Sequence, residues 1–298
     1  MADSDDPRAA YRARFFRVVD FIDRHLDADE DLSVERLAGV AAFSKFHFLR
    51  QWTALFGLGV HEHVQLARLR RASYQLAFRD ATSVIDVAMD SGYESPEAFA
   101  RAFKKRFGQT PTDFRKQPEW QAWHAAYERT QELRRQRMQE QPSETPVEIV
   151  TFEETRVGVL EHRGDPARIG DTLRRFIQWR RDNALPPKVS ATFNLLYADP
   201  ATTPPEAFRL DLCAGVRGPI APNDAGVYER IIPAGRCARL RHVGSDDGLA
   251  AAFARLYGEW LPASGQEVRD FPLFLRRVAF FPDVPEHEAV TEIYLPLK

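Results

Sequence analysis

Two stretches of the chain repeat the same order of hydrophobic and polar positions, at an offset of 50 to 51 residues. Each copy has a short apolar segment with a small residue, Ala38 or Ala88, then a turn, then a longer segment of aromatic residues at helical spacing. A stripe of this period predicts an amphipathic helix with one buried face. The stripes are Phe48, Trp52 and Phe56 in the first copy and Phe99, Phe103 and Phe107 in the second. A small residue lets two helices cross closely, so the pattern predicts two helix-turn-helix motifs.

The second helix of each predicted motif has an outer face opposite its aromatic stripe. Ser44 and Ser95 precede these helices and are placed to cap them. In a helix-turn-helix protein the outer face of the second helix enters the major groove of double-stranded DNA. The alternative is a pair of helical hairpins with solvated faces, but two copies in register favour DNA binding. The predicted DNA-binding residues are Lys45, Phe46, Leu49 and Arg50 in the first copy and Pro96, Glu97, Ala98, Ala100 and Arg101 in the second.

The two predicted recognition helices differ in the chemistry that they present. Arginine forms paired hydrogen bonds with guanine in the major groove, so direct readout rests mainly on Arg50 and Arg101. Leu49 is limited to apolar contact, such as with a thymine methyl group. We therefore expect the first copy to carry most of the sequence discrimination and the second copy mainly to position the protein on the DNA backbone.

Composition and charge narrow the class of protein. The chain has 298 residues, enough for two domains, with 44% hydrophobic and 28% charged residues. The longest apolar runs are shorter than a membrane span, and the acidic start is unlike a signal peptide, so we expect a cytoplasmic protein without a membrane partner. Cys213 and Cys237 lack metal-ligand spacing and are expected to be packed thiols. The sequence predicts neither a metal site nor a cofactor.

The net charge of −2 is unevenly distributed. Residues 32–117 contain 13 lysines and arginines against 8 acidic residues, whereas residues 147–298 contain 19 against 21. The positive excess therefore lies in the segment with the two motifs, as expected of a DNA-binding domain. Candidates for phosphate contact are Arg68, Arg70, Arg71, Lys104, Lys105, Arg106, Arg115 and Lys116.

The pattern also divides the chain into domains. An amphipathic helix precedes the first copy, and a longer helix over about 62–78 joins the two copies. A polar stretch after Pro118 has the composition of a surface helix or a semi-rigid linker. The predicted boundaries are 1–117 for the DNA-binding domain, 118–146 for the linker and 147–298 for a further domain.

The second half contains its own repeat. The segment 156–165 matches the segment 236–245 at an offset of 80, and in each an alternating strand ends at a His-x-Gly sequence. An amphipathic helix and two strand-like runs follow each copy, which gives a β-α-β-β order twice. The predicted chain is thus multi-domain, with an all-α double helix-turn-helix domain followed by an α+β domain of two β-α-β-β repeats. We expect the two units to pack sheet to sheet around a groove.

Two acidic residues stand at equivalent positions of the second half. Asp211 and Glu292 are 81 residues apart, and Glu292 alternates with Val290 and Tyr294. A carboxylate on such a face either reaches solvent or is buried for a function, because an unpaired buried charge is costly. The predicted ligand-binding residues are Glu292, Asp211, Trp179, Phe193, Tyr197, Trp260 and Tyr294.

Enzyme signatures are weak. His162 and His242 repeat, but each lacks a metal-spaced partner, so we interpret them as hydrogen-bonded strand ends. The sequence has no glycine-rich phosphate loop, no HExxH and no nucleophile elbow. No catalytic residue is therefore predicted.

These motifs resemble known families. Residues from about 10 to 117 resemble the DNA-binding domain of AraC/XylS-type regulators, through both motifs and the closing segment 107–115, FGQTPTDFR. Residues from about 147 to 298 are similar to the GyrI-like small-molecule-binding domain, through both β-α-β-β units and the ending TEIYLPL. The pocket glutamate of the GyrI-like family falls on Glu292. The base-reading positions of the AraC/XylS family fall on Phe46, Leu49, Arg50, Pro96, Glu97, Ala98, Ala100 and Arg101.

The resemblance implies a transcription regulator controlled by a hydrophobic small-molecule effector, with a cation as one option. Double-stranded DNA and RNA polymerase are the implied macromolecular partners. The alternative is a GyrI-like hydrolase, in which Glu292 acts with Tyr197, Tyr257 or Tyr294, or a drug-sequestering protein with an accessory DNA-binding domain.

Overall fold

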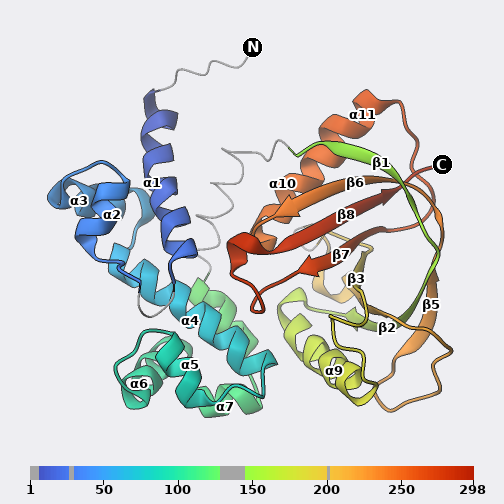
Figure 1. Cartoon of the computed structure of the whole chain (residues 1–298), viewed down its shortest axis with the longest axis horizontal. Helices are drawn as coiled ribbons and strands as arrows, with labels where there is room; N and C mark the ends of the chain where they lie inside the picture. The colour runs from blue at the N-terminus through green and yellow to red at the C-terminus, as the bar shows by residue number, and fades with distance from the viewer. Residues whose placement is uncertain (1–6, 27–29, 128–144, 200–201) are drawn as a thin grey trace. The chain divides into compact units, whose positions relative to one another are not determined.

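The computed structural model describes residues 7–26, 30–127, 145–199 and 202–298 (Figure 1). The chain forms two compact units, residues 1–141 with 285–287 and residues 142–284 with 288–298. Within the described ranges, no helix has both the length and the apolar character needed to cross a bilayer.

The first unit consists of helices. They are α1 (Pro7–Arg24), α2 (Val34–Val40), α3 (Lys45–Phe56), α4 (Val60–Phe78), α5 (Val84–Asp90), α6 (Pro96–Phe107) and α7 (Pro111–Lys116). The predicted stripes are confirmed, because Phe48, Trp52, Phe99 and Phe103 are fully buried. The helices α2 and α3 form the first helix-turn-helix motif, and α5 and α6 form the second.

Capping residues mark the ends of the recognition helices α3 and α6. The hydroxyl of Ser95 accepts a hydrogen bond from the backbone N–H of Ala98, which confirms the predicted cap of α6. Ser44 occupies the corresponding position before α3 but makes no such bond. Both recognition helices end on a glycine with positive φ, Gly57 at 68° and Gly108 at 76°, a conformation that glycine adopts without steric cost.

The first unit extends beyond the predicted boundary at residue 117. Residues 120–127 are helical, and Trp120, Trp123 and Tyr127 are buried. The indole N–H of Trp123 donates to the hydroxyl of Ser73 on α4 at 2.6 Å. This aromatic stripe has helical spacing, but polar neighbours mask it in the sequence. The rest of the predicted linker, 128–144, lies outside the described residues.

His63 on α4 is buried in the first unit against Trp52, with the two rings 5.4 Å apart. Neither ring nitrogen has a hydrogen-bond partner among the described residues. Burial lowers the pKa of His63 below its ordinary value of 6.5, and Asp23 offsets this only in part. As the pH falls below the ordinary value, the unfolded chain therefore takes up a proton that the folded chain refuses, and the folded state loses stability.

We expect the free energy of unfolding to fall between about pH 7 and pH 5, at up to about 1.4 kcal/mol per pH unit from this one group. His63→Leu should flatten that part of the profile in urea unfolding experiments. His61→Leu on the exposed side of the same helix is the control and should keep the wild-type slope. A His63→Leu profile as steep as that of the wild type would contradict the assignment.

The second unit is built on one antiparallel sheet of eight strands, in the order β1-β6-β8-β7-β3-β4-β2-β5. The strands are β1 (Val147–Phe152), β2 (Thr155–Arg163), β3 (Thr192–Leu196), β4 (Arg209–Gly215), β5 (Tyr228–Ile232), β6 (Gly235–Val243), β7 (Leu273–Ala279) and β8 (Val290–Pro296). The helices are α9 (Ile169–Asp182), α10 (Leu249–Ala254), a π-helical turn (Arg255–Trp260) and α11 (Leu261–Ser264).

The two predicted repeats are present, but they do not pack sheet to sheet. They join edge to edge, because β3 of the first repeat pairs with β7 of the second in the middle of the sheet (Figure 1). A strand also precedes each repeat and pairs with the other one: β1 pairs with β6, and β5 pairs with β2. Main-chain hydrogen bonds at the central pair and at both exchanged strands therefore hold the repeats together, and the expected groove between two sheets is absent from this arrangement.

The two faces of the sheet carry different side chains. Helix α9 packs on one face through Phe176 and Trp179, and the segment from α10 to α11 packs on the same face through Leu249 and Leu256. The other face, which we call the aromatic face, has a buried centre of Phe152, Phe193, Phe274 and Tyr294. Side chains two residues apart on a strand share a face, so Asp211 lies with Cys213, and Glu292 with Tyr294, on the aromatic face.

Candidate functional site

The recognition helix α3 presents all four predicted DNA-binding residues to solvent. Phe46 is 71% exposed and Leu49 is 38% exposed, whereas Phe48 and Trp52 on the opposite face are buried. The ammonium group of Lys45 pairs with Glu35 at 2.9 Å. The result is a mixed apolar and basic surface, with Arg50 also exposed.

The recognition helix α6 presents a sparser surface. Glu97 and Arg101 are exposed, whereas Pro96, Ala98 and Ala100 are half-buried. Pro96 begins the helix, where its missing N–H costs nothing. The structure thus places the predicted residues of both copies on outward faces, and it leaves Arg101 as the one basic side chain among those predicted for α6.

Three of the predicted phosphate contacts have structural roles instead. Arg70 is buried, with 6% of its surface exposed. Arg106 donates to the carbonyl oxygen of Ala126 at 2.6 Å, and Arg115 donates to that of Thr82 at 2.7 Å. Of the remaining candidates for phosphate contact, Lys104, Lys105 and Lys116 are exposed, and Arg68 and Arg71 are half-buried.

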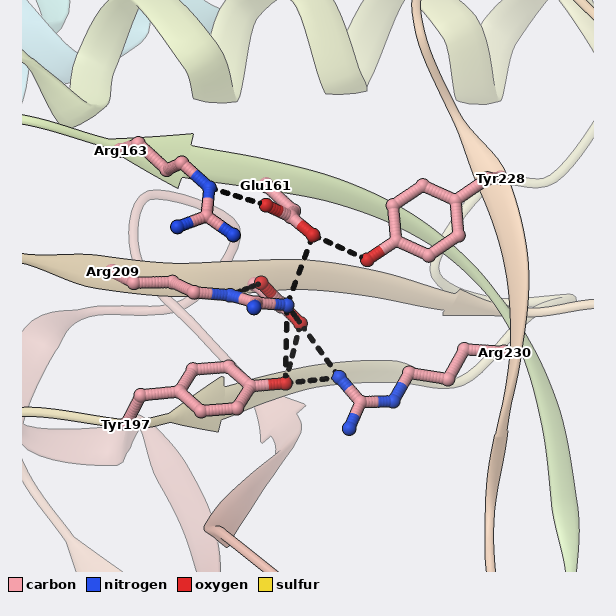
Figure 2. Close-up of polar contacts among 7 residues, drawn as sticks. Glu161, Arg163, Tyr197, Arg209, Tyr228 and Arg230 are labelled. Atoms are coloured by element: carbon pink, nitrogen blue, oxygen red, sulfur yellow. Dashed lines mark hydrogen bonds and ion pairs between the residues drawn. The ribbon is translucent and has the colours of Figure 1, made fainter.

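In the second unit, Asp211 is the centre of a closed network on the aromatic face. Figure 2 labels its partners Tyr197, Arg209 and Arg230. Its carboxylate is 0% exposed and accepts a hydrogen bond from the hydroxyl of Tyr197 at 2.7 Å. Arg209 donates to it through Nε and one terminal nitrogen, each at 3.0 Å. Arg230 adds a contact at 3.2 Å. Four donors therefore hold the two oxygens of this buried carboxylate.

A second carboxylate extends this network toward solvent. Glu161 accepts hydrogen bonds from the hydroxyl of Tyr228 at 2.6 Å and from Arg163 at 2.7 Å (Figure 2). Arg209 lies 3.0 Å from Oε1 of Glu161, the oxygen that also accepts from Tyr228, and thus links Glu161 to Asp211. Within the protein itself, three arginines thus pair with the two acids of this network.

Glu292 occupies the equivalent position in the second repeat but is held differently. It accepts one hydrogen bond, from the hydroxyl of Tyr294 at 2.9 Å. Its carboxylate lies near Arg276, Arg239 and Arg241, but at 3.7, 3.8 and 3.9 Å, beyond hydrogen-bond distance. Burial of the Glu292 side chain is nearly complete, with 10% exposed.

The tyrosines of both clusters are held as neutral phenols. Burial, followed by the hydrogen bond to Asp211, raises the pKa of Tyr197 to about 12. Burial and the bond to Glu292 raise the pKa of Tyr294 as well. Both side chains therefore act as hydrogen-bond donors to their carboxylates at neutral pH.

The structure brings together some of the predicted ligand-binding residues and separates others. Phe193 lies in the buried centre of the aromatic face, between the Asp211 and Glu292 clusters. Trp179 and Trp260 belong instead to the apolar clusters on the helix-covered face. A helical stripe identifies a tryptophan as buried, but it does not tell which face of a sheet the helix covers.

The two repeated histidines have the structural role that the sequence predicts. His162 bonds to the hydroxyl of Thr172 at 2.8 Å and to the carbonyl oxygen of Asp165 at 3.1 Å. His242 bonds in the same way to the carbonyl oxygen of Ser245 at 2.9 Å. In the parts of the chain that the structure describes, no group of three or more histidine, cysteine or acidic side chains is placed to hold a metal ion.

Sequence reasoning missed the arginines that surround both carboxylates. Arg209 precedes Asp211 by two residues, so strand alternation alone places the two side chains on one face. Strand alternation is thus sufficient to predict that Arg209 neighbours Asp211. The arginines around Glu292 come from the neighbouring strands β6 and β7, and strand order cannot be read from a single sequence.

Comparisons with known proteins agree with this division of the chain. Residues 145–298 match the family described as the GyrI-like small molecule binding domain, and residues 37–117 match a helix-turn-helix domain. The probable transcriptional regulator YgiV of Escherichia coli (strain K12) is 38% identical over 152 residues, which cover 51% of this chain and 95% of YgiV. The right origin-binding protein of the same strain is 33% identical over 103 residues, 35% of each chain.

A solved DNA-binding domain also aligns with part of the chain. The crystal structure of the DNA-binding domain of AdpA in complex with a target DNA has a TM-score of 0.32 and 28% identity, and it covers 38% of this chain and 94% of that one.

The helix-turn-helix pair, the matched helix-turn-helix domain and the relative YgiV define the class of protein, a DNA-binding transcription regulator of AraC type. The chain belongs to the GyrI-like family of small molecule binding domains, which accounts for its second half.

Proposed function

We propose that this regulator binds operator DNA through α3 and α6, and that a small molecule held beside Glu292 changes its affinity for that operator. RNA polymerase is the further partner that we propose for the DNA-bound protein. Phe46, Arg50 and Arg101 are the proposed base-contacting residues, because they project from the outward faces of the two recognition helices.

One observation carries the effector half of the proposal. Asp211 and Glu292 are equivalent buried carboxylates, but Asp211 has four donors within hydrogen-bond distance and Glu292 has one. A nearly buried carboxylate with incomplete hydrogen bonding is held at a cost, and a ligand that completes the bonding is favoured. We therefore place the ligand at Glu292 and assign Asp211 a structural role.

The alternative function is a hydrolase in which Glu292 is the general base and a tyrosine orients it. The hydrogen bond from Tyr294 to Glu292 would serve either function, so the preference for binding rests on the relatives. The relatives named above are regulators or DNA-binding proteins, in agreement with a non-enzymatic role.

The test is a thermal-shift screen of apolar acids, amines and neutral compounds on the full chain, followed by operator affinity with and without each hit. A ligand at about 100 times its Kd stabilises the folded state by about 2.7 kcal/mol. We expect this stabilisation in the wild type and in the exposed control Glu206→Gln, but not in Glu292→Gln.

The same ligand must also change operator affinity, because coupling between two sites is reciprocal. Hits that stabilise Glu292→Gln as much as the wild type would contradict the location of the site. Hits that leave operator affinity unchanged would contradict the coupling.

A further inference from the structure

We infer that Arg14 of α1 is a positioning residue for DNA recognition, because it holds the turn that sets the direction of the recognition helix α3. This inference rests on the proposed function of α3 as a reader of operator DNA. Arg14 belongs to neither recognition helix, so it acts on DNA binding through the turn between α2 and α3.

The turns of the two helix-turn-helix motifs have the same backbone pattern. In the first turn, the N–H groups of Ala42 and Phe43 donate to carbonyl oxygens of α2 at 2.9 and 3.0 Å. In the second turn, the N–H groups of Gly92 and Tyr93 donate to carbonyl oxygens of α5 at 2.9 and 3.3 Å. This pair of bonds ends a helix on a residue in the left-handed conformation, and that residue is usually a glycine.

The first turn lacks two local features that stabilise the second. The left-handed residue of the second turn is Gly92, with φ of 74°, whereas that of the first is Ala42, with φ of 55°. A β-carbon makes this conformation unfavourable. The hydroxyl of Ser95 caps α6, whereas Ser44 makes no side-chain cap to α3. The first turn is therefore the one that needs support from elsewhere in the fold.

Arg14 gives the first turn this support. Its Nε donates to the carbonyl oxygen of Ala41 at 2.8 Å, and a terminal nitrogen donates to that of Ala42. The centre of its guanidinium group lies 3.8 Å from the centre of the Phe43 ring. The two carbonyl groups stand at the C-terminal end of α2, where a positive charge is favoured. One side chain thus contacts three consecutive residues of the turn.

Phe43 connects the turn to the core of the first unit. Its ring stacks on Phe15 of α1 at 5.3 Å and meets the ring of Tyr11 edge-on at 5.6 Å. The helix α3 begins at Lys45, two residues after Phe43. A change at the turn therefore changes the direction of α3 and of the outward face that it presents to DNA.

The first experiment measures the affinity of Arg14→Ala for an operator selected from randomised duplexes and for a duplex of unrelated sequence. We expect operator binding to weaken by about tenfold, the scale of one mismatched base pair. Binding of the unrelated duplex should not change, because it depends on phosphate contacts. Arg17→Ala, an exposed arginine of the same helix, is the matched control and should bind both duplexes as the wild type does. Equal losses of Arg14→Ala on both duplexes would overturn the inference.

The second experiment tests the part played by the turn. Adding Ala42→Gly to Arg14→Ala should restore most of the lost operator affinity, because glycine adopts the left-handed conformation without support. Ala42→Gly alone should have little effect. Arg14→Lys should lose nearly as much affinity as Arg14→Ala, since a lysine keeps the charge but not the planar fork of donors. Wild-type affinity in Arg14→Lys, or no recovery on adding Ala42→Gly, would indicate a direct phosphate contact and overturn the inference.

Amide hydrogen exchange tests the turn in the absence of DNA. The N–H groups of Ala42 and Phe43 should exchange faster in Arg14→Ala than in the wild type, because the turn opens more often. Those of Gly92 and Tyr93 should keep their wild-type rates, which also shows that the variant is folded. Unchanged exchange at Ala42 and Phe43 would overturn the inference.

Arg50→Ala separates failure of this inference from failure of the proposed function. If Arg50→Ala weakens operator binding and Arg14→Ala does not, α3 reads DNA without help from Arg14, and the inference alone fails. If neither variant weakens operator binding, the proposed role of α3 fails and the inference fails with it. Faster exchange at Ala42 and Phe43 in that case would leave Arg14 with a role in stability only.

Discussion

Replacing Arg50 or Arg101 with alanine is expected to weaken specific operator binding by about 1–3 kcal/mol each, or roughly 5- to 150-fold. Both side chains are exposed on the outward faces of their recognition helices. An arginine in the major groove donates two hydrogen bonds to a guanine, and alanine leaves those acceptors without a partner. The fold should survive both changes, because neither side chain belongs to the buried core.

The operator is first obtained by selection from randomised duplexes with the full-length chain, and affinities are then measured by fluorescence anisotropy at fixed salt. We expect Arg50→Ala to relax base preference more than Arg101→Ala, since α3 also carries Phe46 and Leu49. Arg217→Ala, an exposed arginine of the second unit, is the matched control and should bind as the wild type does. Wild-type operator affinity in both variants would refute the assignment of the DNA-contacting faces.

The second large effect is expected from Asp211→Ala, which should lower the free energy of unfolding of the GyrI-like domain by about 3–5 kcal/mol. The carboxylate is 0% exposed and accepts bonds from Tyr197, Arg209 and Arg230. Removing it leaves two guanidinium groups and a phenol without their acceptor in a half-buried site. The remaining exposure of the arginines, 22% and 29%, lets water replace part of the loss and favours the lower end of the range.

Glu292→Ala is the matched control, since it removes the equivalent carboxylate from a site with one hydrogen bond. Its cost should be smaller, about 1 kcal/mol. Both variants are measured by urea unfolding, with the helical unit followed separately because the two units need not unfold together. Equal losses for Asp211→Ala and Glu292→Ala would mean that the two hydrogen-bond networks contribute equally to stability. That result would remove the basis for placing the ligand at Glu292.

The helical half of the protein could be predicted from its pattern because helices are local. The stripes of Phe48 and Trp52, and of Phe99 and Phe103, follow from spacing alone, and the buried faces then define the outward ones. The stripe of Trp120, Trp123 and Tyr127 obeys the same rule. The polar residues between its members conceal this stripe in the sequence.

The second half was predictable as two repeats but not as one sheet. Alternation places Glu292 with Tyr294 and Asp211 with Cys213, yet it does not tell which strand lies beside which. The exchanged strands β1 and β5 and the central pairing of β3 with β7 join residues far apart in the sequence. For the same reason, the sequence does not tell that Trp179 and Trp260 lie on the helix-covered face, opposite to that of Asp211 and Glu292.

Local spacing in the sequence is therefore sufficient to identify the two helix-turn-helix motifs, their outward faces and the two equivalent acids, because each depends on residues a few positions apart. The difference between the acids depends on strand neighbours. Asp211 is closed by Arg209 and Arg230, whereas Glu292 lies in a row with Arg241 and Arg276 from strands on either side. Hydrogen bonds and charges act over a few ångströms in space, so this distinction exists only after the sheet has brought distant segments together.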